Sequence, residues 1–269
     1  MSTERERLIE LQKSQWQSLE NLCTSLSLVE WETDTDCPTW TVKDCLSHLT
    51  GIEHRLLGRE VAELSLQETS HIRNDFGLQT EIDVVSRRAM TPAEVLEEFT
   101  EVNLERLRVL NGQLDFSAEA DSPIGKGNVA DQVSVRVFDC WVHEQDIRRA
   151  IGKPGNLSGL AAQHSYERIT SVMPFVFGKK VGGPEGSSLR LNIYGKSFFV
   201  ANIRVEEGRA RLVKKLSEPT VELKMDCETF MCLSCGRWEP DKVLSDCKVS
   251  IQGDKHLGIS IVKNMNYMV

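Results

Sequence analysis

The hydrophobic pattern of this chain changes its period partway along, and that change limits the class of fold. From Glu4 to about Ser27, apolar residues recur at a helical spacing. Beyond the glycine-rich turn FGKKVGGPEGSS, apolar and polar residues alternate instead, as they do in strands with one buried face. The pattern therefore predicts an α+β chain in which a four-helix bundle is followed by a smaller α+β domain.

Start and stop signals divide the first part into long helices. Thr39 or Thr41 can cap a helix, and Asp44 lies three residues after Thr41 as the acid of a capping box. Thr91 precedes a proline that fits the first turn of another helix. The last long helix includes residues 136–149 and stops at GKPG. Four long helices around a polar site are typical of a bundle.

The GKPG stretch is also the predicted domain boundary, which separates residues 1–153 from residues 154–269. One more helix is expected after it, at about 157–176. We then expect four strands, a helix near Cys227–Cys235, another short strand and a terminal helix from about Lys255. The strand sequences are LRLNIYG, FFVANIRVEEG, ARLVKK, TVELKMD and the short KVSIQGD.

The composition excludes several classes of protein. With 269 residues, 40% hydrophobic and 27% charged, the chain resembles an ordinary globular protein. A net charge of −8 argues against a nucleic-acid partner, because such a surface is normally basic. No apolar run approaches the roughly 18 residues that span a bilayer, so no membrane partner is expected. The charged start MSTERERLIELQKSQW is unlike a secretory signal, which predicts a cytoplasmic protein.

Eight cysteines are scattered along the chain, and without a secretory signal they are expected to be free thiols. Cys232 and Cys235 form the only pair with metal or redox spacing. A zinc ribbon needs a second pair, and a thioredoxin-type motif must open a helix after a strand. This pair lies inside a helix-like run, so we expect structural thiols.

The run RVFDCWVHEQDIRR contains the strongest chemical signal. Asp139 and His143 are four residues apart in a predicted helix, so both side chains share one face. His48 lies upstream, in the predicted helix that follows Thr41. Two imidazoles and one carboxylate make a three-ligand set that leaves coordination positions open, as catalytic metal sites do. Zinc suits this set, although nickel, iron or manganese can also occupy it.

The segments DCLSHLTGIEHRLLGRE, HIRNDFG, EVLEEF and WVHEQDIRRAIGKPG together resemble the mycothiol-dependent maleylpyruvate isomerase family. That family belongs to the DinB-like metal-binding four-helix bundles, and its C-terminal domain is similar to sterol carrier proteins. The resemblance covers nearly the whole chain. It implies that His48, Asp139 and His143 are the metal ligands. Asp139 departs from the glutamate of the maleylpyruvate isomerase branch, which shortens the carboxylate arm.

The resemblance implies an enzyme that uses a low-molecular-weight thiol on a small electrophilic substrate. A coordinated thiol loses its proton and can attack a conjugated carbon. Collapse of the adduct after bond rotation gives cis–trans isomerisation, and its release gives S-transfer. We favour S-transfer, because the isomerase branch has glutamate at the acidic position. The thiol is expected to be mycothiol-like, with bacillithiol, ergothioneine and glutathione as alternatives.

Two other functions stay open at this point. The chain can be a metal-containing module that holds an apolar ligand without turnover, or a hydrolase in which metal-activated water replaces the thiol. It can be a monomer or a homo-oligomer.

Outside the metal ligands, three residues are candidates for contacts with an anionic substrate or thiol. Asn74 lies in HIRND and Arg87 in an SRR pair, both of which match family patterns, and Arg237 matches a recurrent Gly-Arg of the C-terminal domain. Surface polarity or packing explains these residues equally well. Glu144, next to His143, is expected to be a structural or supporting acid.

Overall fold

The computed structural model describes residues 3–60, 64–66, 72–122 and 125–268. The chain divides into two compact units, the first ending at Gly155 and the second beginning at Asn156. The predicted boundary, after residue 153, lies two residues earlier. We describe each unit by itself.

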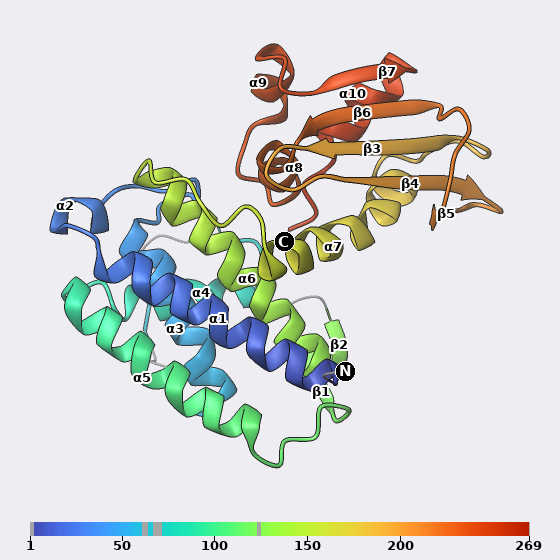
Figure 1. The fold of residues 1–269 in the computed structure, drawn as a ribbon. Coiled ribbons are helices and arrows are strands. Elements are labelled where there is room, and N and C mark those ends of the chain that lie inside the picture. Colours follow the sequence, from blue (N-terminus) through green and yellow to red (C-terminus); the bar gives the residue numbers. More distant parts are fainter. Residues whose placement is uncertain (1–2, 61–63, 67–71, 123–124, 269) are drawn as a thin grey trace. The chain divides into compact units, whose positions relative to one another are not determined.

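Four long helices form the first unit: α1 (Glu4–Thr24), α3 (Val42–Leu56), α5 (Pro92–Asn111) and α6 (Val129–Ala150). Helices α3 and α5, and likewise α1 and α6, pack against each other, as Figure 1 shows. Each of the four begins with a capping box, in which side chains satisfy backbone N–H groups that the first turn leaves unpaired. The predicted caps Thr41 and Thr91 are both present.

Shorter elements connect these helices. They are α2 (Leu28–Trp31), α4 (Asp75–Val85) and an antiparallel hairpin of β1 (Glu119–Ser122) and β2 (Gly125–Asn128). This hairpin was not predicted from the sequence. Its strands are too short and too polar to show the alternation that identifies a strand.

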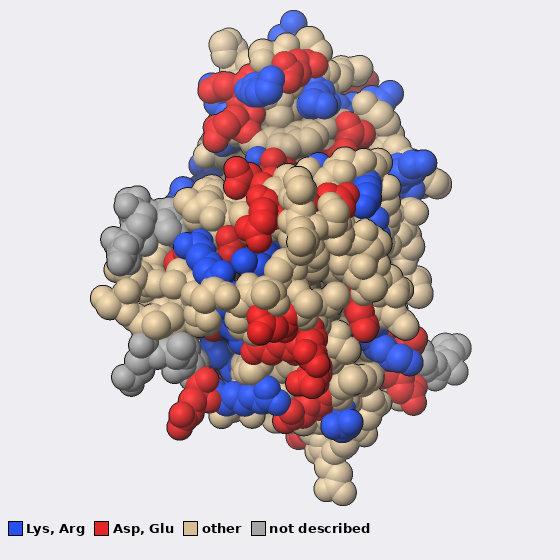
Figure 2. Space-filling view, turned by 90° about the vertical axis from the view of Figure 1, so that its left-hand side faces the viewer, with Lys and Arg blue, Asp and Glu red and all other residues tan. Residues whose placement is uncertain are grey.

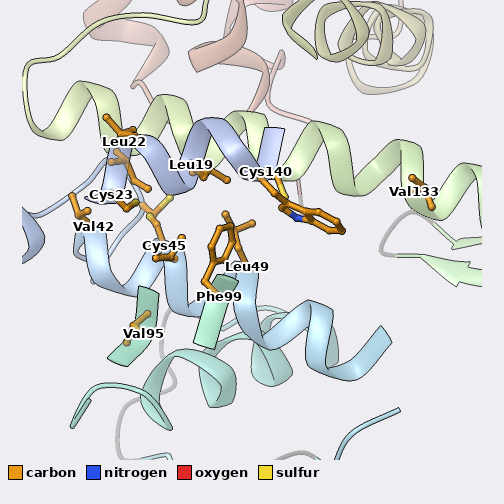
Figure 3. Packing of buried hydrophobic residues seen from close by; sticks show 14 of the residues in the cluster. Leu19, Leu22, Cys23, Val42, Cys45, Leu49, Val95, Phe99, Val133 and Cys140 are labelled. Atoms are coloured by element: carbon orange, nitrogen blue, oxygen red, sulfur yellow. The ribbon is translucent and has the colours of Figure 1, made fainter. Parts of the chain in front are cut away.

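Apolar side chains from all four long helices fill the interior of the first unit. Leu19, Leu49 and Phe99 are almost fully buried there, and Figure 3 shows residues from different helices directed into a shared core. Cys23, Cys45 and Cys140 belong to the same cluster, where they pack as small hydrophobic groups.

The second unit combines one mixed sheet with helices. Its strands are β3 (Ser188–Tyr194), β4 (Phe199–Glu206), β5 (Arg209–Val213), β6 (Val221–Asp226) and β7 (Ser250–Gly253), in the order β5-β4-β3-β6-β7. Only β3 and β6 pair in parallel. The helical elements are α7 (Leu160–Phe175), the π-helical turn η1 (Val176–Lys180), α8 (Cys227–Ser234), α9 (Pro240–Ser245) and α10 (Lys255–Lys263).

In the strands of the second unit, the apolar residues that alternate with polar ones are the residues that are buried. Leu189, Leu191 and Ile193 of β3 are buried, whereas the residues between them are partly exposed. Helices α7, α8 and α10 pack on this sheet. The predicted α+β class is therefore confirmed. The sequence did not predict α9.

Charged residues of both signs lie side by side on the face shown in Figure 2. Because opposite charges are neighbours on this face, their electrostatic potentials partly cancel. Within the described residues, no helix combines the length and apolar character needed to cross a membrane.

Candidate metal centre

Helices α3 and α6 bring the three predicted metal ligands together inside the first unit. His48 Nε2 lies 3.4 Å from Asp139 Oδ2, and His143 Nε2 lies 3.5 Å from Asp139 Oδ1. One ligand atom from each residue lies within 4.8 Å of the other two. Both histidines are buried, and the Asp139 side chain is 19% exposed. Two imidazole nitrogens and a carboxylate oxygen fit a divalent transition metal and leave room for further ligands.

Burial sets the protonation of the first ligand. It lowers the pKa of His48 to about 4, although the charge of Asp139 acts in the opposite direction. His48 is therefore neutral near pH 7, with a lone pair available to a metal. Its Nδ1 is buried and has no hydrogen-bond partner in the part of the chain that the structure describes. Packing positions the ring instead, with the Trp40 ring centroid 5.1 Å away.

His143 is held by hydrogen bonds on its other nitrogen. Its Nδ1 lies 3.1 Å from Asp146 Oδ2, the oxygen to which Cys37 Sγ donates at 3.2 Å. Burial opposes protonation, but the hydrogen bonds with Asp146 and Cys37 outweigh it and raise the pKa of His143 to about 10. A carboxylate on Nδ1 fixes the ring and leaves Nε2 directed at the ligand cluster, as in many metal sites.

A buried ion network supports the acidic ligand. Arg136 Nη1 pairs with Asp139 Oδ2, and Arg136 Nε donates to Glu53 Oε1 at 2.8 Å. Glu53 Oε2 lies 3.5 Å from Arg106 Nε. Burial disfavours the charged form of Asp139, but His48 and Arg136 outweigh it and hold the pKa of this carboxyl well below its usual range. Asp139 is therefore ionised, and its orientation depends on Arg136.

The segment between α2 and α3 closes over the two histidines. Arg149 Nε donates to Asp36 Oδ2 at 2.7 Å, which ties this segment to α6. The ring of Trp40 lies 5.1 Å and 5.9 Å from the two imidazole rings, between centroids, and its Nε1 donates to Glu81 at 2.9 Å. The indole thus forms an apolar wall beside the ligand cluster.

The first unit also contains a cavity of about 700 Å³, whose lining includes none of the three predicted ligands. Its volume is in the range of small-molecule sites. The charged groups around it pair with one another: Lys43 lies 3.4 Å from Glu32, and Arg88 lies 3.2 Å from Glu81. The lining residues are Glu32, Thr39, Thr41, Lys43, Asp44, Ser65, Leu66, Glu81, Val85 and Arg88.

The supporting residues were not predicted from the sequence, although two of them had a local signal. Asp146 follows His143 by three residues and Arg136 precedes Asp139 by three, both neighbouring positions on a helix. Glu53, Cys37 and Trp40 have no such signal, because their contacts cross between distant segments.

The other predicted contact residues do not join the ligand cluster. Asn74 caps α4, where its Oδ1 accepts from Gly77 N at 2.8 Å. Arg87 donates from Nε and Nη2 to Glu98, both at 2.8 Å. Arg237 belongs to the second unit and donates to the carbonyl of Cys235 at 2.9 Å. His71, which begins HIRNDFG, lies outside the described residues.

We expect Arg87, the predicted contact for an anionic substrate or thiol, to contribute to the stability of the first unit. Its guanidinium is mostly buried and makes both of its paired hydrogen bonds to Glu98. Arg87→Ala should lower the free energy of unfolding by about 2 kcal/mol, the usual scale for hydrogen bonds to charged groups. Urea unfolding and elemental analysis check this, with the exposed Arg73→Ala as control. Wild-type stability and metal content in Arg87→Ala would contradict it.

The same pair makes stability depend on pH. Burial disfavours ionisation of Glu98, but hydrogen bonds from His54 and Arg87 outweigh it and lower its pKa from 4.5 to about 2. Its contribution is therefore complete above about pH 4.5 and is lost as pH falls toward 2. The fall in unfolding free energy across this window should be shallower in Arg87→Ala than in the wild type.

Two secondary expectations concern residues outside the cluster. Glu144 is fully buried and accepts from Ser18 at 2.8 Å and from Arg148 Nε at 2.7 Å, so it links α1 to α6 as a structural acid. Cys232 lies in α8 and Cys235 follows it, both buried. Among the described residues, neither belongs to a group of potential metal ligands.

Comparison with known proteins gives a family and a fold. The model of the mycothiol maleylpyruvate isomerase N-terminal domain matches residues 13–148. No curated protein matches the chain significantly.

The crystal structure of mycothiol-dependent maleylpyruvate isomerase is similar with a TM-score of 0.57 and 13% identity, covering 94% of this chain and 96% of that chain. A histidine-to-alanine mutant of it gives 0.58 and 14%, with the same coverage. At such identity the likeness shows the fold. A sterol carrier protein 2-like protein from Aedes aegypti gives only 0.31, with 17% identity, over 38% of this chain and 96% of that chain.

Proposed function

This chain belongs to the mycothiol maleylpyruvate isomerase family, and on that premise we propose that it is a metal-dependent enzyme acting with a low-molecular-weight thiol such as mycothiol. The family supports a thiol-dependent isomerase. Its substrate is then a small electrophile with a conjugated double bond. The observation that carries the metal dependence is the convergence of His48, Asp139 and His143 in one buried cluster.

The residues of this chain would prepare the site for a cation and a thiol. His48 is neutral and Asp139 is ionised, so both present lone pairs to a divalent metal, with zinc the best match to the donor set. A divalent cation held there would lower the pKa of a thiol that coordinates it. Asp146 and Arg136 orient the ligands, and Trp40 limits access of water.

S-transfer is the second candidate reaction. It is favoured by Asp139, whose carboxylate arm is one methylene shorter than that of the glutamate in the isomerase branch. A cation held by the shorter arm would lie closer to α6, which would change the space left for thiol and substrate. Both reactions share the attack of the thiol on the electrophilic carbon and differ in whether the thiol leaves again.

One experiment separates these functions. Metal-loaded protein is incubated with maleylpyruvate or another conjugated electrophile and with a panel of thiols: mycothiol, bacillithiol, ergothioneine and glutathione. Recovery of the trans isomer with unchanged thiol indicates isomerisation, and a thioether product indicates S-transfer. Turnover that is independent of added thiol would favour a hydrolase, and its absence with every thiol would favour a binding module.

We expect the thiol to be external rather than Cys140 of the protein. Cys140 is fully buried, and Gln12 Nε2 and Arg136 Nη2 donate to its sulfur at 3.4 Å and 3.6 Å. Burial raises the pKa of Cys140 to about 12, so this thiol is protonated near pH 7 and is a poor nucleophile.

Cys140→Ala should therefore keep its thiol-dependent rate within a few-fold while losing about 1 kcal/mol of stability through a small cavity. Initial rates with and without added thiol, together with urea unfolding, measure both quantities. Full turnover without added thiol that disappears in Cys140→Ala would overturn the external-thiol mechanism.

A further inference from the structure

A second group of metal-ligating atoms adjoins the first. Cys37 Sγ, Cys45 Sγ and a nitrogen of His143 all lie within 4.8 Å of one another, and all three residues are buried. Cys37 Sγ is 3.9 Å from Nδ1 of His143, whereas Nε2 of the same ring faces Asp139. Because these nitrogens are on different edges of the imidazole, the two groups lie on either side of one ring.

Contacts within the protein hold the sulfur atoms of Cys37 and Cys45 in place without a bound ligand. Cys45 lies in the first turns of α3, and Cys37 lies in the segment between α2 and α3. Thr35 connects them, since its Oγ1 accepts from Cys37 N at 3.2 Å and lies 3.7 Å from Cys45 Sγ. The ion pair of Asp36 with Arg149 fixes the same segment to α6. These contacts therefore place both sulfurs beside His143 without any ligand.

We propose that Cys37, Cys45 and Nδ1 of His143 form a second metal site, for soft d10 cations such as Cu⁺ or Cd²⁺. Thiolate sulfur prefers soft cations, whereas the first ligand set, with a carboxylate, is harder. Metal–sulfur bonds of about 2.3 Å and metal–nitrogen bonds of about 2.0 Å fit a group of this size. Each thiol that coordinates releases its proton to solvent, and so does Nδ1. Asp146, 3.2 Å from Cys37 Sγ, is close enough to accept a rearranged hydrogen bond or to supply a further ligand.

This site goes beyond the proposed function and has a consequence for it. In the first site, the proton on Nδ1 of His143 bonds to Asp146 and thereby orients Nε2. A soft cation on Nδ1 displaces that proton. Occupation of the second site should therefore disturb the geometry of the first and make soft cations inhibitory.

The test is a cadmium titration that records the ultraviolet thiolate-to-cadmium charge-transfer absorption. All variants carry Cys247→Ala, because Cys247 is the exposed cysteine among those described, and a phosphine reductant keeps the thiols reduced. His48→Ala removes the first ligand set and leaves the second. Cys45→Ala and Cys37→Ala remove the second set, and Cys23→Ala is a matched control, buried in the same core.

We expect the absorption to rise to about one equivalent of cadmium in the background protein, in His48→Ala and in Cys23→Ala. The rise should be lost in both Cys45→Ala and Cys37→Ala, with circular dichroism showing that they are folded. Equal amplitude in Cys45→Ala and Cys23→Ala would overturn the second site. If either Cys45→Ala or Cys37→Ala does not fold, the cadmium absorption of the other variant tests the second site. Because the readout is absorbance, it is independent of thiol-dependent turnover, so the second site and the proposed function can fail separately.

Discussion

His48→Ala is expected to yield folded protein that has lost its metal, with thiol-dependent turnover reduced by more than about 100-fold. Mutating a residue that only supports a metal ligand typically lowers metal affinity or activity by about 10–100-fold. His48→Ala removes a predicted ligand itself, so its effect should be larger. The two remaining ligands, Asp139 and His143, cannot form a three-ligand site. The fold should survive, because Nδ1 of His48 makes no hydrogen bond to the described residues and the ring is held by packing.

The control for this prediction is His54→Ala. His54 lies in the same helix α3, but its Nε2 pairs with Glu98 at 2.9 Å, away from the ligand cluster. It should therefore keep its metal. Elemental analysis and initial rates are measured on both variants. Stoichiometric metal in His48→Ala would show that the three residues are not the ligand set.

The second large effect is expected for Glu53→Ala. Glu53 is almost fully buried and is the carboxylate that faces both Arg136 and Arg106. Its removal takes the shared carboxylate away from two buried guanidinium groups and leaves Asp139 alone to compensate Arg136. Breaking a buried ion pair in this way typically costs about 3–5 kcal/mol. Glu53→Gln keeps the shape and one acceptor, so it should cost less. Both losses are measured as free energies of unfolding in urea.

An exposed acid of the same bundle, Glu101, serves as the matched control, and Glu101→Ala should change stability by less than about 0.5 kcal/mol. The Glu53 variant also has an expected effect on the site. Arg136 would lose the contact that fixes its Nε, so its hold on Asp139 would weaken. A Glu53→Ala protein with wild-type stability would mean that the network does not contribute to folding.

The sequence predicted those features that depend on neighbours within one helix. The caps at Thr41 and Thr91 and the shared face of Asp139 and His143 follow from spacings of three and four residues. His48 was identified as a third possible ligand in the predicted helix after Thr41, and the family resemblance implied the same set. Features formed between segments were beyond this reasoning. The contact of Arg136 with Glu53 joins positions 83 residues apart, and no local pattern indicates it.

Polar residues near family motifs were harder to interpret for a related reason. Arg87 and Asn74 have the chemistry to bind an anion, but a helix cap and an ion pair need the same donors and acceptors. The structure gives these residues contacts with Glu98 and with the first turn of α4. Their partners are set by the packing of α4 and α5, which composition does not reveal.

The pairing of Asp139 with Arg136 also bears on the order in which this protein matures. A partly buried carboxylate compensated only by a cation would make folding depend on metal, as in small zinc-folded domains. Here the guanidinium compensates the carboxylate as soon as the bundle closes, and Glu53 compensates the guanidinium in turn. Closure of the bundle therefore does not require a cation beside Asp139. The metal proposed for this site would then enter a bundle that is already folded.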